Sequence, residues 1–157
     1  MPLGTWSPVT PADDPMASEI ALADMDREGR VWGLVRSEAA IACWGKGRRS
    51  RISLEQLGMG SVNVSGMVLD ALDHLWLATR DHGVVAISCS ALFACMAGSS
   101  KVPAIHWFDS SSGLGSKGGS YATECIRQAP DGRLWVANNG GISVINPAVW
   151  QAERERA

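Results

Sequence analysis

The sequence lacks the features that would assign it to a membrane or to a nucleic acid. No stretch approaches the roughly 18 consecutive apolar residues of a membrane-spanning helix, and the N-terminus M-P-L-G-T-W-S-P has neither the basic segment nor the apolar run of a signal peptide. The 14 Lys and Arg residues against 16 Asp and Glu give a net charge of −2. Taken literally, the sequence predicts a cytoplasmic protein with no membrane span, and its charge gives no reason to expect nucleic-acid binding.

Motifs for catalysis and for cofactor binding are also scarce. The chain has no C-x-x-C pair and no G-x-S-x-G nucleophile motif, and His74, His82 and His106 have no neighbours at metal-ligand spacing. The glycine-rich stretch from Gly113 to Gly119 lacks the G-K-S/T ending that binds phosphate and magnesium, so we interpret it as a loop. We therefore expect no enzymatic activity, no cofactor and no metal site in this chain.

The four cysteines and one calcium-like pattern have simpler structural interpretations. The cysteines are dispersed and fit buried free thiols better than disulfides; they are Cys43, Cys89, Cys95 and Cys125. The stretch Asp24-x-Asp26-x-Glu28-Gly29 begins like a calcium loop, but its twelfth position is Val35 where the loop needs a Glu. We predict a turn between two strands there.

Tryptophan is the abundant aromatic residue, with seven Trp against one Tyr and two Phe. The clearest unit around a Trp is the stretch 129–147, which reads A-P-D-G-R-L-W-V-A-N-N-G-G-I-S-V-I-N-P. Asp131-Gly132 is a tight-turn pair, since Gly tolerates the positive φ that a short hairpin demands. Leu134–Ala137 then predicts a strand, and Asn138–Gly141 turns the chain back into the strand Ile142–Ile145.

Two earlier stretches carry the same acidic turn, apolar residue and Trp, around Trp32 and Trp76. From Trp32 to Trp76 is 44 residues and from Trp76 to Trp135 is 59. A period in the forties is typical of a four-stranded propeller blade. The longer second interval contains two additional segments, Ser90–Lys101 and Ser110–Ser120.

The pattern predicts an all-β fold: a partial β-propeller of about three four-stranded antiparallel blades, with a short helix between blades and at the C-terminus. The predicted organisation is a partial outer strand and linker at 1–19, propeller blades at 20–147 (about 20–60, 61–109 and 120–147), and a C-terminal tail or helix at 148–157. We expect strands at Ile20–Ala23, Arg30–Val35, Ala39–Trp44, Arg51–Leu54, Val62–Leu69, Leu75–Thr79, Val84–Ser88, Ala104–Phe108, Thr123–Gln128, Arg133–Ala137 and Gly141–Ile145. We also expect a basic loop at Gly45–Ser50, and a helix at Ala91–Ala97 with Ser90 as its N-cap.

Three blades do not close a ring, because closed propellers have four or more. Two apolar blade faces would remain open, each a surface for aggregation or self-association. The sequence therefore predicts either a longer protein, of which this chain is a fragment, or an assembly of copies.

The turn, L-W-V-A strand, Gly-Gly or His-Gly turn, short apolar strand and final N-P resemble the two-component regulator propeller repeat. This family forms the extracytoplasmic sensor regions of bacterial hybrid two-component sensor histidine kinases. The resemblance covers about Ile20–Pro147 and includes Ile105–Asp109 followed by Gly113-Leu114. It implies a ligand-sensing segment for a small molecule or carbohydrate, a periplasmic location, and signal transduction through a longer parent, since this chain has no kinase motif.

Propeller ligands commonly bind over the central channel, between the loops that join the blades. By that geometry the candidate ligand-binding residues are Arg80, Asp81, His82, Tyr121, Glu124, Asn138 and Asn139. One rival is a lyase of the virginiamycin B type, a propeller enzyme with a catalytic His and metal-binding acidic residues, for which His82 or His106 would be essential. The other rival is a scaffold that joins partners through its open blade edges.

Overall fold

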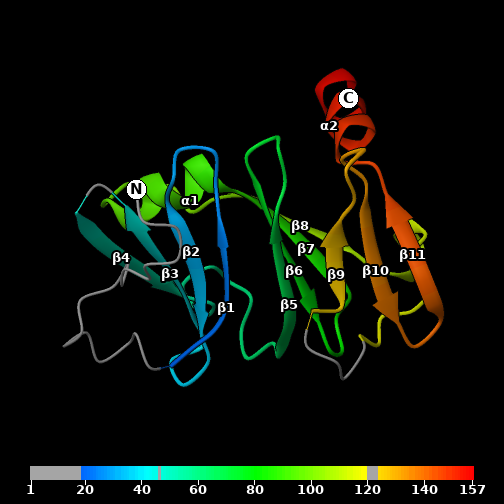
Figure 1. Ribbon diagram of the computed structural model, residues 1–157, viewed down its shortest axis with the longest axis horizontal. Coiled ribbons are helices and arrows are strands. Elements are labelled where there is room, and N and C mark those ends of the chain that lie inside the picture. The colour runs from blue at the N-terminus through cyan, green and yellow to red at the C-terminus, as the bar shows by residue number, and fades with distance from the viewer. Residues whose placement is uncertain (1–18, 46, 120–123) are drawn as a thin grey trace, which may run out of the picture.

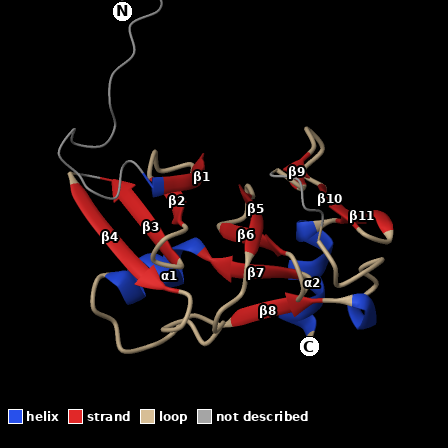
Figure 2. Cartoon of the chain, turned by 90° about the horizontal axis from the view of Figure 1, so that it is seen from below, coloured by secondary structure: helices blue, strands red, loops and turns tan. Residues whose placement is uncertain are grey.

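The computed structural model describes residues 19–45, 47–119 and 124–157, which form three antiparallel sheets. The first sheet has the order β1 (Ile20–Met25), β2 (Val31–Val35), β3 (Ala40–Gly45) and β4 (Arg48–Ser53). The second has the order β5 (Val64–Leu69), β6 (His74–Thr79), β7 (Val84–Ser88) and β8 (Ile105–Phe108), and the third has the order β11 (Gly141–Ile145), β10 (Leu134–Asn138) and β9 (Ile126–Gln128). The sheets stand side by side in Figure 1 and fan out from β1, β5 and β9 in Figure 2, which confirms the predicted all-β class and its blade arrangement.

Each sheet is a meander whose turns come from the predicted punctuation. Gly29 and Gly132 have φ of 74° and 84° in the hairpins before β2 and β10, which an L side chain rarely adopts. Asp73 occupies the corresponding turn of the second sheet at φ 70°, because Asp tolerates the left-handed region better than most residues. These short turns place neighbouring strands antiparallel and adjacent.

The three repeated tryptophans lie at matching points, each on the second strand of its sheet. Trp32 and Trp76 are fully buried, and each indole Nε1–H donates to the carboxylate of the residue six positions earlier, Asp26 or Asp70, at 2.7 Å. Trp135 has Ala129 at that earlier position and is 41% exposed. The Asp–Trp pair is therefore a feature of the first two blades only.

Blades pack face to face through the sides that carry the tryptophans. The Trp32 side of the first sheet contacts Leu75 and Leu77 of the second in one apolar cluster. In the same way, the Trp76 side of the second sheet contacts Leu134 and Val136 of the third. This repeated contact, in which one sheet's Trp face covers the next sheet's aliphatic face, buries the core and sets the stacking direction.

Two α-helices among the described residues attach to this stack. α1 (Cys89–Met96) follows β7, and α2 (Pro147–Arg156) follows β11, so both leave the third strand of a blade. The hydroxyl of Ser88 caps α1 by accepting from the Ala91 amide. The predicted N-cap, Ser90, was therefore wrong by two residues. Asn146 caps α2 before Pro147 at its first position, which suits proline because that residue needs no amide hydrogen bond.

The third sheet has three strands among the described residues, one fewer than a full blade, as the predicted strands of the third unit indicated. Two details of the prediction differ from the structure. The predicted basic loop is partly strand, because β4 begins at Arg48 and pairs along its length with β3. Helix α1 begins at Cys89 and ends at Met96, earlier than predicted. The proposed partial outer strand at 1–19 lies almost entirely outside the described residues.

Candidate functional site

The β2–β3, β6–β7 and β10–β11 turns all lie at one end of the stack, at the bottom of Figure 1. We call this end the lower face. The loop 54–63 and the described segment 109–119 after β8 reach the same end. The lower face therefore brings together exposed turns from three blades, as the sequence analysis expected for a ligand site.

Between the second and third blades, the glycine-rich loop Gly113–Gly119 fills the lower face. The Gly119 amide donates to the carbonyl of Arg80 at 2.8 Å, and the Asn139 amide donates to the carbonyl of Gly118 at 2.9 Å. A Cβ atom on Gly119 would lie 2.3 Å from a backbone oxygen of β6. The glycines therefore serve close backbone packing, and the loop closes this junction.

Between the first and second blades, the lower face holds an open pocket of about 370 Å³. Polar groups line it from both blades: Arg36 of the β2–β3 turn, Ser61 and Asn63 of the connecting loop, and Arg80 at the end of β6. The Arg80 amide donates to the carbonyl of Asn63 at 2.9 Å, which fixes the loop against the second blade. The volume of the pocket falls within the roughly 300–1,000 Å³ typical of small-molecule sites.

The structure places the predicted residues of the β6–β7 turn differently from one another. Arg80 is half-buried and lines the pocket, whereas Asp81 and His82 are exposed on the turn. The His82 ring lies 6.3 Å from the Trp107 ring of β8, centroid to centroid. His82 thus faces the outer strand of its blade and does not line the pocket beside Arg80.

The predicted residues of the third blade lie around its own turn. The Asn138 amide group donates to the Ser143 hydroxyl at 2.9 Å, and its carbonyl oxygen accepts from the Gly140 amide at 2.9 Å, so Asn138 holds the β10–β11 turn. Asn139 is exposed at the tip. Glu124 is exposed, has φ 68° and pairs with the Arg127 guanidinium, while Tyr121 lies outside the described residues.

Three polar residues of the pocket were not predicted from the sequence: Arg36, Ser61 and Asn63. They are not adjacent to Arg80 in the sequence and carry no motif. The sequence carried a usable signal for Arg36 alone. Arg36 follows Trp32 by four residues, and Arg80 follows Trp76 by the same four residues in the next repeat. Aligning the repeats would have paired these two arginines.

At the opposite end, two carboxylates serve the fold. Burial opposes ionisation of Asp70, but hydrogen bonds from His74, Trp76 and the His74 and Leu72 amides outweigh it, so the pKa of Asp70 lies below its ordinary value. The Asp26 pKa is lowered in the same way: burial opposes ionisation, and hydrogen bonds from Trp32 and Arg30 outweigh it.

Asp24, the first residue of the calcium-like pattern, accepts the Leu69 amide of the second blade at 2.8 Å. Across the described ranges, no group of three or more His, Cys, Asp or Glu side chains is placed to hold a metal ion. The calcium-like stretch therefore forms a turn and a bond between blades.

The histidines relevant to the lyase hypothesis lie on different elements. His106 of β8 packs against Trp150 of α2, with ring centroids 5.4 Å apart. Its pKa is lowered by burial first and then by the nearby charges of Arg154 and His74. His82 lies on the lower face, and the two imidazoles are not joined by any described interaction.

The fold defines a class of protein: antiparallel sheets stacked as the blades of a partial propeller. The extracellular domain of BT3049 from B. thetaiotaomicron, described as a hybrid two-component system, matches 86% of this chain at a TM-score of 0.59 and 12% identity. The extracellular domain of BT4673 from the same organism, also described as a hybrid two-component system, matches 83% at a TM-score of 0.58 and 18% identity. This chain spans only 16–17% of the length of those chains.

The likeness to these extracellular domains is one of fold. No family model matches the sequence, and no curated protein matches it. In the described part of the chain, neither helix has the length and apolar character needed to cross a membrane.

Proposed function

We propose that this chain is a ligand-sensing segment of the extracytoplasmic region of a two-component signal-transduction protein. The observation that carries the proposal is the repeated stacking of sheets, each covering the aliphatic face of the next, in the fold of two extracellular sensor domains. In this proposal the chain contributes recognition, and a longer parent carries the membrane span and the kinase. The segment itself catalyses no reaction and acts in the periplasm.

The exposed Trp135 face supports a longer parent. Trp32 and Trp76 are fully buried under the following blade, whereas Trp135 is 41% exposed, with Ile142 at 71% and Val144 at 44% on the same face. In the two covered junctions this face receives the aliphatic side of another sheet. A fourth blade docked on Trp135 would repeat the same contact.

The free edge of β11 points to the same conclusion. In the first two sheets the third strand pairs with a fourth, β4 or β8, whereas β11 pairs only with β10 among the described strands. An edge strand with unpaired amides and carbonyls is a site for further strand pairing. A complete third blade would add one strand beside β11.

The direct test is to sequence the reading frame on both sides of this segment. The proposal expects further acidic-turn, Leu-Trp units, a membrane-spanning segment and a kinase module in the same frame. A frame in which this segment is the only propeller unit, or which joins it to a cytoplasmic enzyme, would contradict the proposal.

The scaffold hypothesis is favoured by one specific observation, the same exposed Trp135 face. If this face binds a second copy or another protein, the isolated chain should associate as its concentration rises, with no small ligand present. Sedimentation equilibrium over a range of concentrations, applied to the full propeller, separates the two functions. A sensor segment within its full propeller has this face covered by another blade and should remain monomeric.

A further inference from the structure

The junction pocket on the lower face differs chemically from the protein as a whole. The chain has a net charge of −2, yet the pocket is lined by two arginines, and no carboxylate is among its described lining residues. Glu38 of the β2–β3 turn pairs with Arg51 of β4. Two cationic side chains therefore line one pocket of an otherwise slightly acidic molecule.

The pocket is also built from both blades. Arg36 comes from the first blade and Arg80 from the second, so its two cationic walls are set by the packing of Trp32 against Leu75 and Leu77. Leu54 lines the same pocket and is 1% exposed, which anchors the connecting loop in the core. The exposed Arg36 and the half-buried Arg80 thus line one cavity from two different blades.

The junction between the second and third blades shows why this cavity is open. There the glycine-rich loop enters between two blades and bonds to both turns. The corresponding loop of the first junction instead forms tight turns next to β4, with the Gly58 amide donating to Glu55 and the Met59 amide donating to Leu54. Leu57 and Met59 of this loop are buried in the core, so its chain turns away and leaves the cavity beside Ser61 and Asn63.

We propose that this pocket binds a small organic carboxylate with an apolar body. A guanidinium presents parallel N–H donors that match the two oxygens of a carboxylate, and Arg36 and Arg80 supply two of them. The Asn63 amide and the Ser61 hydroxyl add neutral donors, while Leu34, Leu54 and Val64 give the pocket an apolar side. This proposal deepens the proposed function, because it assigns a ligand class to the same lower face.

Benzoate is a suitable probe, and benzamide is its neutral match in size and shape. Titration of the full chain, followed by NMR shifts of backbone amides or by calorimetry, should show benzoate binding at least about tenfold more tightly than benzamide. Inorganic sulfate should compete, since it offers oxyanion contacts without the apolar body. Equal affinity for benzoate and benzamide, or no benzoate binding up to about 10 mM, would overturn the proposal.

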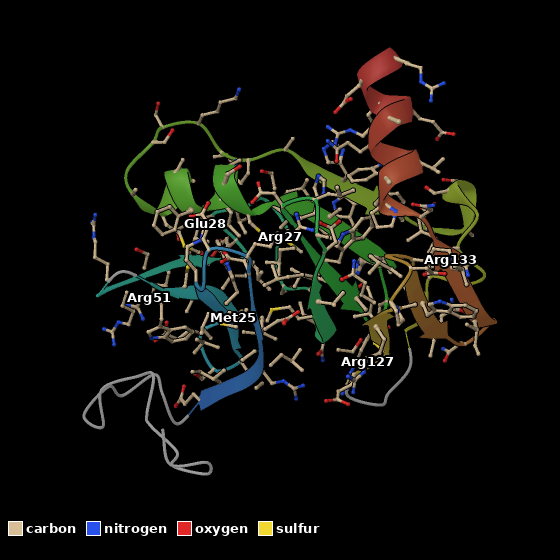
Figure 3. All side chains as sticks on the ribbon, turned by 45° about the horizontal axis from the view of Figure 1, so that its top comes forward. Met25, Arg27, Glu28, Arg51, Arg127 and Arg133 are labelled. Carbon is tan, nitrogen blue, oxygen red and sulfur yellow. The ribbon has the colours of Figure 1, made fainter. Side chains whose placement is uncertain are left out.

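Arginine variants test the two walls. Arg36→Gln and Arg80→Gln should each weaken benzoate binding about 10- to 100-fold, as expected for loss of a charge-assisted hydrogen bond. Arg27→Gln is the matched control, because Arg27 is exposed on the β1–β2 turn at the other end of the stack (Figure 3). Equal losses of benzoate affinity in all three variants would indicate non-specific electrostatic attraction and refute a built site.

A second pair of variants leaves both arginines in place. Ala39 lines the pocket, is exposed and has φ 45°, a conformation that Asp and Asn adopt more readily than most residues. Ala39→Asp should abolish benzoate binding by placing a carboxylate in the pocket, whereas Ala39→Asn should retain it. If both variants bind benzoate as the parent does, the pocket is not the site; the sensor assignment would still depend on the flanking sequence.

Discussion

Replacing Asp70 by Ala would test the Asp–Trp pair that stabilises the first two blades. The Asp70 side chain is 1% exposed, and its oxygens accept from the Trp76 indole at 2.7 Å, the Leu72 amide at 2.8 Å and the His74 amide at 2.9 Å. Hydrogen bonds to a charged acceptor contribute about 1.5–3 kcal/mol each and do not add fully. Leaving these buried donors unpaired should lower the free energy of unfolding by about 3–5 kcal/mol.

Urea unfolding followed by circular dichroism measures this loss. Asp131→Ala is the matched control, because Asp131 lies in the equivalent hairpin of the third blade, pairs only with exposed Arg133, and should change the unfolding midpoint little. Figure 3 shows Arg133 on that third blade. A loss below about 1 kcal/mol for Asp70→Ala, the range of exposed ion pairs, would refute the assigned role of the Asp–Trp pair.

The pH dependence of stability provides a second test of Asp70. Because the pKa of Asp70 is lower in the folded than in the unfolded state, its contribution is present above the unfolded pKa near about 4 and is lost as pH falls through the folded pKa. The parent protein should therefore lose stability on acidification below about pH 4, and Asp70→Asn should flatten that part of the profile. An unchanged profile would mean that Asp70 is not the group responsible.

Three further predictions follow from packing and exposure. Gly119→Ala should destabilise the fold by about 1–3 kcal/mol, since its Cβ would lie 2.3 Å from a backbone oxygen. Gly115→Ala should cost less in thermal unfolding, because its Cβ would meet no atom closer than the Ser143 hydroxyl oxygen at 3.3 Å. Trp135→Ser should leave stability nearly unchanged and reduce self-association in sedimentation experiments, because Trp135 is 41% exposed; unchanged association would rule out that face. Iodoacetamide at pH 8 should label Cys95 first, because it is the one cysteine among the four that is not buried. Burial raises the pKa of Cys43 to about 11, so its thiol should react slowly. Mass spectrometry measures the order of labelling, and labelling of Cys43 before Cys95 would contradict the prediction.

Most of the fold could be predicted because hairpins are local. Acidic or glycine turns, short apolar runs and a recurring Trp placed nine of the eleven strands within two residues at both ends, since each feature depends on neighbours a few positions away. The N-cap of α1 was misplaced because Ser88 and Ser90 have the same capping chemistry, and only the path of the chain out of β7 selects Ser88. The stretch Gly45–Ser50 was predicted to be a loop because a run of basic residues is typical of a solvated hairpin tip, yet pairing with β3 makes Arg48–Ser50 part of β4.

The candidate site could be predicted only in part. Arg80 follows a recognisable strand, so its position at a turn could be inferred, and it lines the pocket. Arg36 and Asn63 carry no motif and reach the same cavity only because two sheets pack against each other. Asn138 has a polar side chain suited to a ligand, but the structure uses it to close its own turn. A side chain's chemistry does not reveal whether its hydrogen bonds are already satisfied within the fold.

The sequence by itself determined the repeat: the turn residues, the strand order within each blade and the position of each tryptophan, all of which act over a few residues. Tertiary structure alone decided which tryptophans are buried. Trp32 and Trp76 are covered because another sheet lies against them, and Trp135 is exposed because no described sheet does. It also decided which junction is open, since a cavity between Arg36 and Arg80 exists only where the connecting loop turns toward the core and leaves the space between two blades unfilled.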